Sequence, residues 1–218
     1  MKHNILTRPP ELSPDWALFL DVDGTLVPLA DTPDAAQPTS DLLPVLKKVS
    51  AAVGGALALV SGRALSGVDR LAPLFGPAAG MHGLERRRAD GHLLEISEPK
   101  ASLRAFAADL RLFESENAGI ICEDKGPTVT LHYRMAPDRE TAARQLLERH
   151  RDSLETDYTF QEGKMMIEVK PIGATKAGAV KAFMKEAPFT GRLPVFVGDD
   201  ITDEDGFKAV HEHGGKSI

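Results

Sequence analysis

The chain of 218 residues has almost no cysteine, no excess of positive charge and no long apolar run. Its single cysteine, Cys122, cannot form a disulfide within the chain, which fits a reducing compartment and predicts a cytoplasmic protein. Lysine and arginine number 26 against 32 acidic residues, so the net charge of −6 argues against nucleic acid or an anionic membrane as a partner. No segment approaches the roughly 18 apolar residues of a membrane span, and the polar N-terminal residues lack the pattern of a signal peptide.

What the chain does contain is the composition of an ordinary folded protein, 42% hydrophobic and 27% charged. Continuous apolar runs at 16–22, 55–61 and 193–198, with a shorter one near Ala78, predict strands that are buried on both faces of a parallel sheet. Apolar residues at helical spacing lie between or before these runs, at 42–49, 65–74 and 175–185. Strands that alternate with helices in this way predict a doubly wound α/β fold.

The alternation is interrupted in the middle of the chain. Asp90-Gly91 predicts a hairpin turn between 84–88 and 92–96, with the arginines at 86–88 on a solvated face. A second, α+β pattern follows it: a helix at 100–116, strands at 119–123 and 128–133, a helix at 138–151, and strands at 158–161 and 165–169. We therefore predict a discontinuous core domain, residues 1–97 and 173–218, with a cap domain inserted at 98–172.

Acidic residues follow two of the predicted core strands. Asp21 and Asp23 lie two residues apart with Gly24 next to them, and the segment 199–205 carries five acidic groups in seven residues. In open α/β sheets the ends of the strands form the crevice where ligands bind, so these carboxylates are expected to crowd together there. Such crowding requires a cation, for which Mg²⁺ is the natural choice, and Mg²⁺ keeps open positions for phosphate oxygens.

Each motif also has an alternative interpretation when it is taken singly. Strings such as Asp21-Val-Asp23-Gly form turns and calcium loops, and acidic runs often cap helices. Taken alone, Ser61 is typical of a turn residue at a strand end, and Lys176 is typical of a solvated helix face. Only their order along the chain and their positions after buried strands favour a common site.

These four motifs together resemble the haloacid dehalogenase (HAD) superfamily of phosphatases. Asp21-Val-Asp23-Gly-Thr is similar to its first motif, Ser61 to its second, Lys176 to its third and Gly198-Asp-Asp-Ile-Thr-Asp203 to its fourth. The resemblance implies a Rossmann-like core with a parallel sheet, and an attack by Asp21 on phosphorus that gives an aspartyl-phosphate intermediate. It also implies that Asp23 protonates the leaving group and then deprotonates the hydrolytic water.

The same resemblance assigns the metal and phosphate contacts. Mg²⁺ would be held by the Asp21 side chain, the Asp23 backbone carbonyl and Asp199, while Asp200 and Asp203 would orient the ligands or complete the shell. Thr25 and Ser61 would bind phosphate oxygens, and Lys176 would offset the charge on the phosphate and on Asp21.

Three further strings resemble one subgroup, the trehalose-6-phosphate phosphatases: Gly80-Met-His-Gly-Leu-Glu85, Glu123-Asp-Lys125-Gly and Met166-Ile-Glu168-Val-Lys-Pro171. The resemblance implies an inserted α+β cap of the C2B type, in which Glu123, Lys125 and Glu168 bind the disaccharide, with Arg63 as a further substrate contact. The alternatives are polar residues of a hairpin for Glu123 and Lys125, the polar phase of a strand for Glu168, and a solvated helix start for Arg63. His82 fits a structural histidine and a substrate ligand equally well.

The sequence therefore predicts a monomeric, Mg²⁺-dependent phosphatase that acts on a small-molecule sugar phosphate, trehalose 6-phosphate. A phosphatase for a sucrose-phosphate or a mannosylglycerate-phosphate, a phosphomutase, and a non-catalytic sugar-phosphate sensor are the alternatives. Intact Asp21, Asp23, Lys176 and Asp199 argue against the sensor. Relatives usually continue past the fourth motif with another strand and helix, whereas this chain stops at Gly215-Lys-Ser-Ile218, so we expect either an incomplete sheet edge or a shortened sequence.

Overall fold

The structure is a computed structural model that describes residues 10–28, 36–73, 75–94, 98–163 and 165–218. The chain divides into two compact units, one made of Met1–Glu95 and Ala174–Ile218 and the other of Ile96–Gly173. They are termed the core unit and the cap unit below. The predicted end of the first core segment, residue 97, lies outside the described residues.

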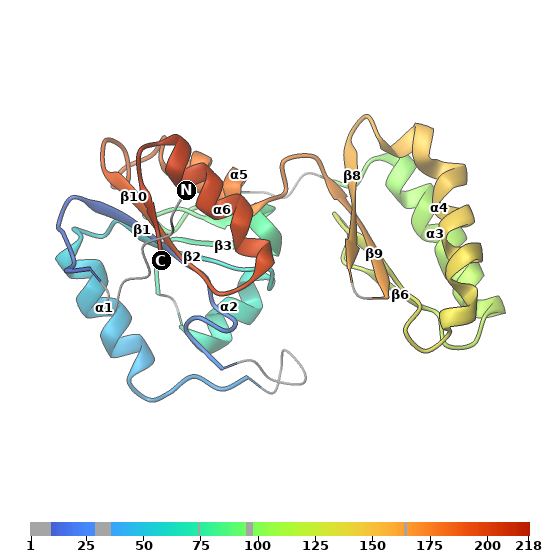
Figure 1. Cartoon of the computed structure of the whole chain (residues 1–218), viewed down its shortest axis with the longest axis horizontal. Helices are drawn as coiled ribbons and strands as arrows, with labels where there is room; N and C mark the ends of the chain where they lie inside the picture. The colour runs from blue at the N-terminus through green and yellow to red at the C-terminus, as the bar shows by residue number, and fades with distance from the viewer. Residues whose placement is uncertain (1–9, 29–35, 74, 95–97, 164) are drawn as a thin grey trace, which may run out of the picture. The chain divides into compact units, whose positions relative to one another are not determined.

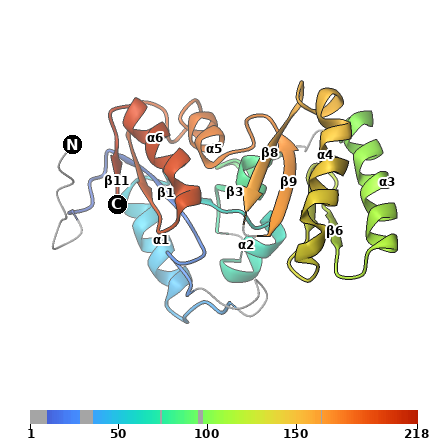
Figure 2. The same cartoon turned by 45° about the vertical axis from the view of Figure 1, so that its right-hand side comes forward.

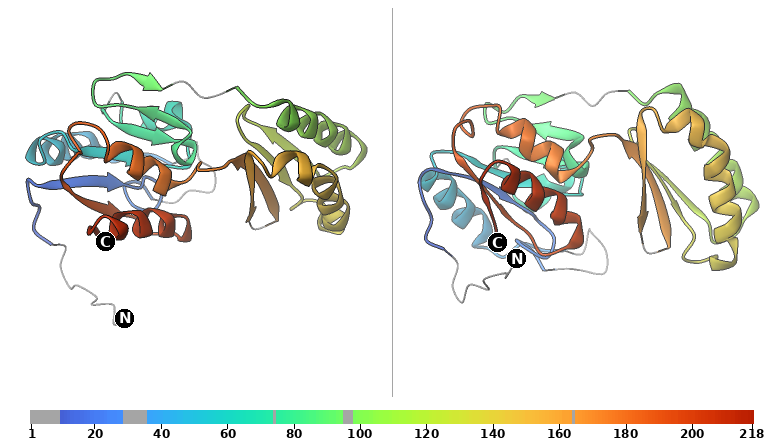
Figure 3. Two further views of the ribbon diagram at one scale, coloured as in Figure 1. Left: turned by 90° about the horizontal axis from the view of Figure 1, so that it is seen from above. Right: turned by 45° about the horizontal axis from the view of Figure 1, so that its top comes forward.

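The core unit is built on a seven-stranded sheet with the strand order β11-β10-β1-β2-β3-β4-β5. Neighbours are parallel from β11 to β3, and the β4–β5 hairpin, green in Figure 3, continues one edge in the antiparallel sense. The strands are β1 (Trp16–Leu20), β2 (Leu57–Val60), β3 (Ala78–Gly80), β4 (Glu85–Arg87), β5 (Leu93–Leu94), β10 (Leu193–Val197) and β11 (Lys216–Ser217).

Helices cover both faces of this sheet, which confirms the doubly wound α/β core. Figure 1 shows α1 (Leu42–Ala52) and α2 (Leu65–Leu71) on one side, with α5 (Lys176–Phe183) and α6 (Glu204–Glu212) on the other. Because both faces are covered, β1 and β2 are continuous apolar runs that are almost entirely buried, as the sequence predicted. Two short 3₁₀ turns, Met81–Gly83 and Ile201–Asp203, follow β3 and β10.

Lys216–Ser217 form β11, a strand of two residues that pairs with β10 at the edge of the sheet. One expectation for the core unit is wrong, because the arginines of the hairpin are not all solvated. Arg87 is 8% exposed and holds Asp69 through two hydrogen bonds of 2.8 Å, while Arg86 pairs with Glu186 and lies over the ring of Phe183. The hairpin packs on its neighbours because its arginines find carboxylates on α2 and after α5.

The cap unit is a four-stranded antiparallel sheet, in the order β6-β7-β9-β8, with two helices on one face (Figure 2). Apolar side chains from α3 and α4 and from alternate strand positions form its own hydrophobic core, in which Leu103, Phe106, Leu131 and Val169 are buried. The elements are α3 (Ala101–Glu116), β6 (Ile121–Asp124), β7 (Val129–His132), a 3₁₀ turn (Pro137–Arg139), α4 (Glu140–Leu154), β8 (Tyr158–Gly163) and β9 (Met166–Pro171). Within the described ranges of both units, no helix has the length and apolar character needed to cross a membrane.

Candidate active site

The site residues of the core unit converge because three neighbouring parallel strands end at the same edge of the sheet. Leu20 at the end of β1 pairs with Val197 of β10 on one side and with Leu59 of β2 on the other. The residues that follow these strands therefore emerge together, and they include Asp21, Ser61 and Asp199. The strand order thus accounts for the meeting of motifs that are nearly 180 residues apart in sequence.

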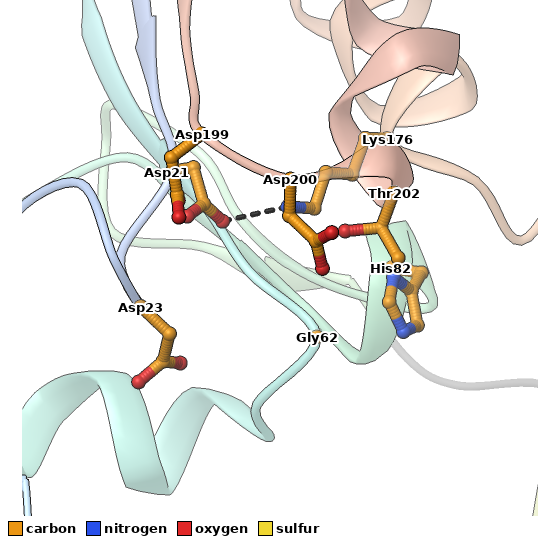
Figure 4. A pocket seen from close by; sticks show the side chains of 8 residues that line it. All are labelled: Asp21, Asp23, Gly62, His82, Lys176, Asp199, Asp200 and Thr202. Carbon is orange, nitrogen blue, oxygen red and sulfur yellow. Dashed lines mark hydrogen bonds and ion pairs between the residues drawn. The ribbon is translucent and has the colours of Figure 1, made fainter. Parts of the chain in front are cut away.

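A pocket of about 480 Å³ opens at this edge (Figure 4). Figure 4 shows Lys176 reaching toward Asp21, whereas Asp23 points away from these two residues toward α2. The lining residues are Asp21, Asp23, Gly62, His82, Lys176, Asp199, Asp200 and Thr202.

Lys176 is the centre of a buried network of charges. Its Nζ lies 2.6 Å from Asp21 Oδ1 and 2.5 Å from Asp203 Oδ1, and all three side chains are at most 5% exposed. Burial raises the pKa of Asp21, an effect that the ammonium of Lys176 opposes. Lys176 begins α5, where the Thr175 hydroxyl caps the helix by accepting a hydrogen bond from the Gly178 amide. The cap fixes the start of the helix and thereby the position from which Lys176 reaches the strand ends.

Asp203 uses both of its carboxylate oxygens within the protein. Oδ1 accepts from Lys176, and Oδ2 accepts from the backbone amides of Asp199 and Asp200 at 3.2 and 3.1 Å. Gly198 gives it room, because a Cβ at that position would lie 2.4 Å from the Asp203 carboxyl carbon. Asp203 therefore shapes the acidic loop and orients Lys176 at the same time.

The carboxylates could also hold a metal ion. Asp21, Asp199 and Asp203 each offer one oxygen, and the three oxygens lie within 4.8 Å of one another. A set of hard oxygen donors fits Mg²⁺. Asp199 is exposed and accepts a hydrogen bond of 3.2 Å from the Thr25 hydroxyl. A Cβ at Gly24 would lie only 2.1 Å from an Asp199 oxygen, so the loop after β1 needs glycine there.

Arg63 holds Asp23 with two hydrogen bonds. Its Nε donates to Asp23 Oδ2 at 2.7 Å, and its Nη2 donates to Oδ1. The Arg63 side chain is 9% exposed, so the solvated helix start considered for this residue is wrong. The Arg63 amide also donates to Ser61 Oγ at 3.0 Å. The segment after β2 is thereby connected to the segment after β1.

The predicted sugar contacts all lie in the cap unit. Glu123 on β6 pairs with Lys125 Nζ at 3.2 Å and with His132 Nε2 at 3.2 Å. Burial alone would raise the pKa of Glu123, but the hydrogen bonds from His132 and Lys125 outweigh it and lower the pKa. Glu168 on β9 is 9% exposed. Glu123 and Glu168 both pair with Thr130, so they lie on the same face of the sheet.

The structure also brings in residues that sequence reasoning missed or left open. Gly62 and Thr202 line the pocket. The available signal was that Gly62 directly follows Ser61 and that Thr202 lies inside the fourth motif. His82 lines the pocket too, in the left-handed backbone conformation with φ 56°. A Cβ at Gly62 would approach the His82 ring to 2.9 Å, so close packing of the ring requires this glycine. Thr25, Ser61, Arg63 and Asp203, which were predicted as site residues, bond to lining residues or to their loops and are not among the lining residues themselves.

Comparisons with known proteins agree with this geometry. Residues 19–218 match the family model "Trehalose-phosphatase". A "Probable trehalose-phosphate phosphatase" of Sinorhizobium fredii (strain NBRC 101917 / NGR234) is 45% identical over 94% of this chain and 77% of its own length. The "Trehalose-6-phosphate phosphatase" of Escherichia coli (strain K12) is 42% identical over 98% of this chain and 80% of its own length.

A solved structure described as a "trehalose-6-phosphate phosphatase related protein" has 27% identity and a TM-score of 0.65. The alignment covers 89% of this chain and 82% of the chain of the solved structure. The fold is the HAD-like α/β fold with a mostly parallel central sheet. The matched family model spans nearly the whole chain, and the two relatives exceed 40% identity. The chain therefore belongs to the trehalose-phosphatase family and is a phosphoric monoester hydrolase.

Proposed function

We propose that the protein is a Mg²⁺-dependent phosphatase that hydrolyses trehalose 6-phosphate to trehalose and phosphate through an aspartyl-phosphate intermediate. The observation that carries the mechanism is the buried Asp21 at the end of β1, which is bonded on one oxygen by Lys176 and faces the pocket beside Asp199. The substrate follows from the relatives, two of which bear the name trehalose-phosphate or trehalose-6-phosphate phosphatase.

Asp21 is suited to act as the nucleophile. Lys176 engages Oδ1, so Oδ2 is the oxygen that attacks phosphorus. A bond forms between this oxygen and phosphorus while the bond from phosphorus to the sugar oxygen breaks. The leaving sugar oxygen takes a proton from Asp23, which is the general acid. Attack of water on the aspartyl-phosphate then releases phosphate, restores the Asp21 carboxylate and returns a proton to Asp23.

Arg63 has a supporting role in this scheme. Its two hydrogen bonds hold the Asp23 carboxylate on the side toward α2. Asp23 must be near the leaving oxygen during the transfer of the proton. The Arg63–Asp23 pair must therefore open for Asp23 to act as acid and base, and Arg63 then offers a cation for a phosphate oxygen.

The metal would be held by Asp21, Asp199 and the backbone carbonyl of Asp23, with Asp200 and Asp203 as orienting residues. When bound, Mg²⁺ supplies positive charge that offsets the carboxylates and the phosphoryl oxygens. Lys176 contributes a second fixed positive charge next to Asp21, and the hydroxyls of Thr25 and Ser61 are available as hydrogen-bond donors to phosphate oxygens. Glu123, Lys125 and Glu168 in the cap unit would bind the sugar hydroxyls.

Phosphate release from a panel of substrates tests this proposal. The panel contains trehalose 6-phosphate, glucose 6-phosphate, a sucrose phosphate, a mannosylglycerate phosphate and an aryl phosphate, each with Mg²⁺ and with EDTA. We expect turnover of trehalose 6-phosphate to exceed that of the other sugar phosphates and to stop in EDTA. A higher kcat/KM for another sugar phosphate contradicts the substrate, and undiminished turnover in EDTA contradicts the metal.

Two further outcomes separate the remaining alternatives. A phosphomutase would yield an isomerised sugar phosphate in place of free phosphate. A sensor would bind a sugar phosphate without releasing phosphate. Acid quenching during turnover, followed by mass spectrometry, is expected to find one added phosphoryl group on the peptide with Asp21 and none in the Asp21→Asn variant.

A further inference from the structure

The face of the cap sheet opposite α3 and α4 is lined by polar side chains in ordered rows. Across the four strands, Glu123 pairs with Thr130, Thr130 with Glu168, and Glu168 with Gln161. Directly opposed residues of antiparallel strands point to the same face, so these four side chains form one row. Apolar neighbours such as Leu131 and Ile167 point to the other face, where the helices pack. This surface is termed the polar sheet face.

A second row lies beside the first. Lys170 pairs with Thr159 across β8 and β9. Thr128 directly precedes Val129, whose partner is Val169, so the antiparallel register brings Thr128 opposite Lys170. The amide of Lys125 donates to the Thr128 carbonyl at 3.0 Å, which continues the row to the predicted sugar contact Lys125. Thr128 is thus adjacent to both predicted kinds of sugar contact, the ammonium and the carboxylates.

Thr128 has a property that no other residue of the described ranges shares. Its Oγ1 is the single buried side-chain nitrogen or oxygen there that has no hydrogen-bond partner. The residue is 3% exposed. A buried hydroxyl without a partner destabilises the fold, and valine would fill the same volume in a strand without that cost. The hydroxyl can therefore bond with a group from outside the protein, either water or a ligand hydroxyl.

We infer that Thr128 is a specificity-determining residue of the sugar subsite, where its hydroxyl exchanges a hydrogen bond with a hydroxyl group of the bound sugar. A threonine hydroxyl both donates and accepts, as a sugar hydroxyl does, so the two are matched partners. Glu168, Lys125 and Lys170 surround it with charged groups that bind further hydroxyls of the same polyhydroxylated ligand. The inference rests on the proposed function and adds to it a neutral contact that motif comparison did not identify.

The test compares Thr128→Val with Thr128→Ser, on trehalose 6-phosphate and on an aryl phosphate that carries no sugar. Valine keeps the volume and removes the hydroxyl, whereas serine keeps the hydroxyl and removes a methyl group. We expect Thr128→Val to raise the KM for trehalose 6-phosphate about fivefold, with kcat and aryl-phosphate turnover unchanged. Its melting temperature in the absence of substrate is expected to rise, because the unpaired hydroxyl is gone. Thr128→Ser is expected to keep the wild-type KM.

The melting temperature separates this inference from a merely structural role. A higher melting temperature of Thr128→Val with an unchanged KM overturns the inference, because the hydroxyl is then only an unsatisfied group or one that water satisfies. An equal loss on both substrates also overturns it, since the residue then acts through the fold. If the wild type hydrolyses another sugar phosphate of the panel in place of trehalose 6-phosphate, the proposed substrate fails, and the same pair of variants tests Thr128 on that sugar phosphate.

Discussion

The core unit and the cap unit present two polar surfaces of opposite design. In the core unit, Asp21 and Asp203 share the ammonium of Lys176 in two buried ion pairs. In the cap unit, carboxylates, hydroxyls, an amide and two ammonium groups lie in rows across a sheet, and the Thr128 hydroxyl has no partner. A network of fixed charges suits a phosphoryl group, whereas mixed donors and acceptors suit sugar hydroxyls.

Because of this difference, we expect substitutions in the two units to affect different classes of substrate. Changes in the core network should affect the hydrolysis of every phosphate ester, because all of them share the phosphoryl group. Changes on the polar sheet face should affect only those esters that carry a sugar. Aryl phosphate and trehalose 6-phosphate are thus a matched pair of substrates, and the ratio of their kcat/KM values reports which unit a residue serves.

The largest effect is expected from Asp21→Asn. An amide cannot form the phosphoryl bond at Asp21, so kcat should fall about 10³-fold or more on both substrates. Steady-state phosphate release measures the loss, and Asp41→Asn, an exposed carboxylate before α1, is the matched control. A kcat of Asp21→Asn within tenfold of the wild-type value would contradict the assignment of Asp21 as the nucleophile.

Lys176→Met should lower stability as well as activity. It leaves the carboxylates of Asp21 and Asp203 buried without their cation, and breaking a buried ion pair in this way costs about 3–5 kcal/mol. Urea denaturation of the protein in EDTA measures the change in the free energy of unfolding. Lys181→Met on the same helix is the control, because its partner Glu212 is exposed and solvent screens such a pair strongly, so little stability should be lost. Equal losses in both variants would contradict the buried network.

Glu168→Gln should distinguish the role of the cap unit in sugar binding from the role of the core unit in hydrolysis. Loss of a charged hydrogen bond to a sugar hydroxyl is expected to raise the KM for trehalose 6-phosphate about tenfold, with aryl-phosphate turnover unchanged. Glu162→Gln is the control in the same sheet, since Glu162 is 66% exposed and pairs with Arg144. If Glu168→Gln slows both substrates equally, the polar sheet face has no separate role in recognising the sugar.

The parts of the molecule that the sequence predicted well are those with local causes. The buried strands β1, β2 and β10 are continuous apolar runs, and the site follows from the polar residues that end each run. Thr175 and Lys176 likewise begin a helix whose apolar spacing is visible in the sequence. A parallel sheet then brings these ends together, so the convergence of the motifs required no knowledge of side-chain contacts.

The features that the sequence did not predict depend on contacts between distant residues. The partner of Arg63 is Asp23, 40 residues away, and neither residue type specifies that choice. β11 has only two residues, which show no strand pattern and pair because β10 offers a free edge. The unpaired Thr128 hydroxyl is a property of its surroundings, so a sequence pattern cannot reveal it. Pairing and its absence are decided by the three-dimensional arrangement.

The smallest expected effect concerns the pH dependence of stability in the two units. In the core unit, hydrogen bonds and charge from Arg86, together with Arg88, lower the pKa of Glu186 below its ordinary value of 4.5. A carboxylate with a lowered folded-state pKa stabilises the protein above its ordinary pKa, and that stabilisation is lost as the pH falls through the lowered value. Glu186→Gln should therefore lower the melting temperature at pH 7 and make its decline between pH 5 and pH 3 less steep. The corresponding change in the free energy of unfolding at pH 7 is expected to be about 1 kcal/mol.

Glu162 in the cap unit provides the comparison. Arg144 lowers the pKa of Glu162 in the same direction, but Glu162 is 66% exposed, whereas the side chain of Glu186 is 19% exposed. Solvent and salt screen the exposed pair more strongly, so Glu162→Gln should change the acid limb of the stability curve less than Glu186→Gln does. Thermal unfolding from pH 3 to pH 7 at low and high salt measures both. Identical pH profiles for the two variants would mean that burial does not distinguish the ion pairs of the core unit from those of the cap unit.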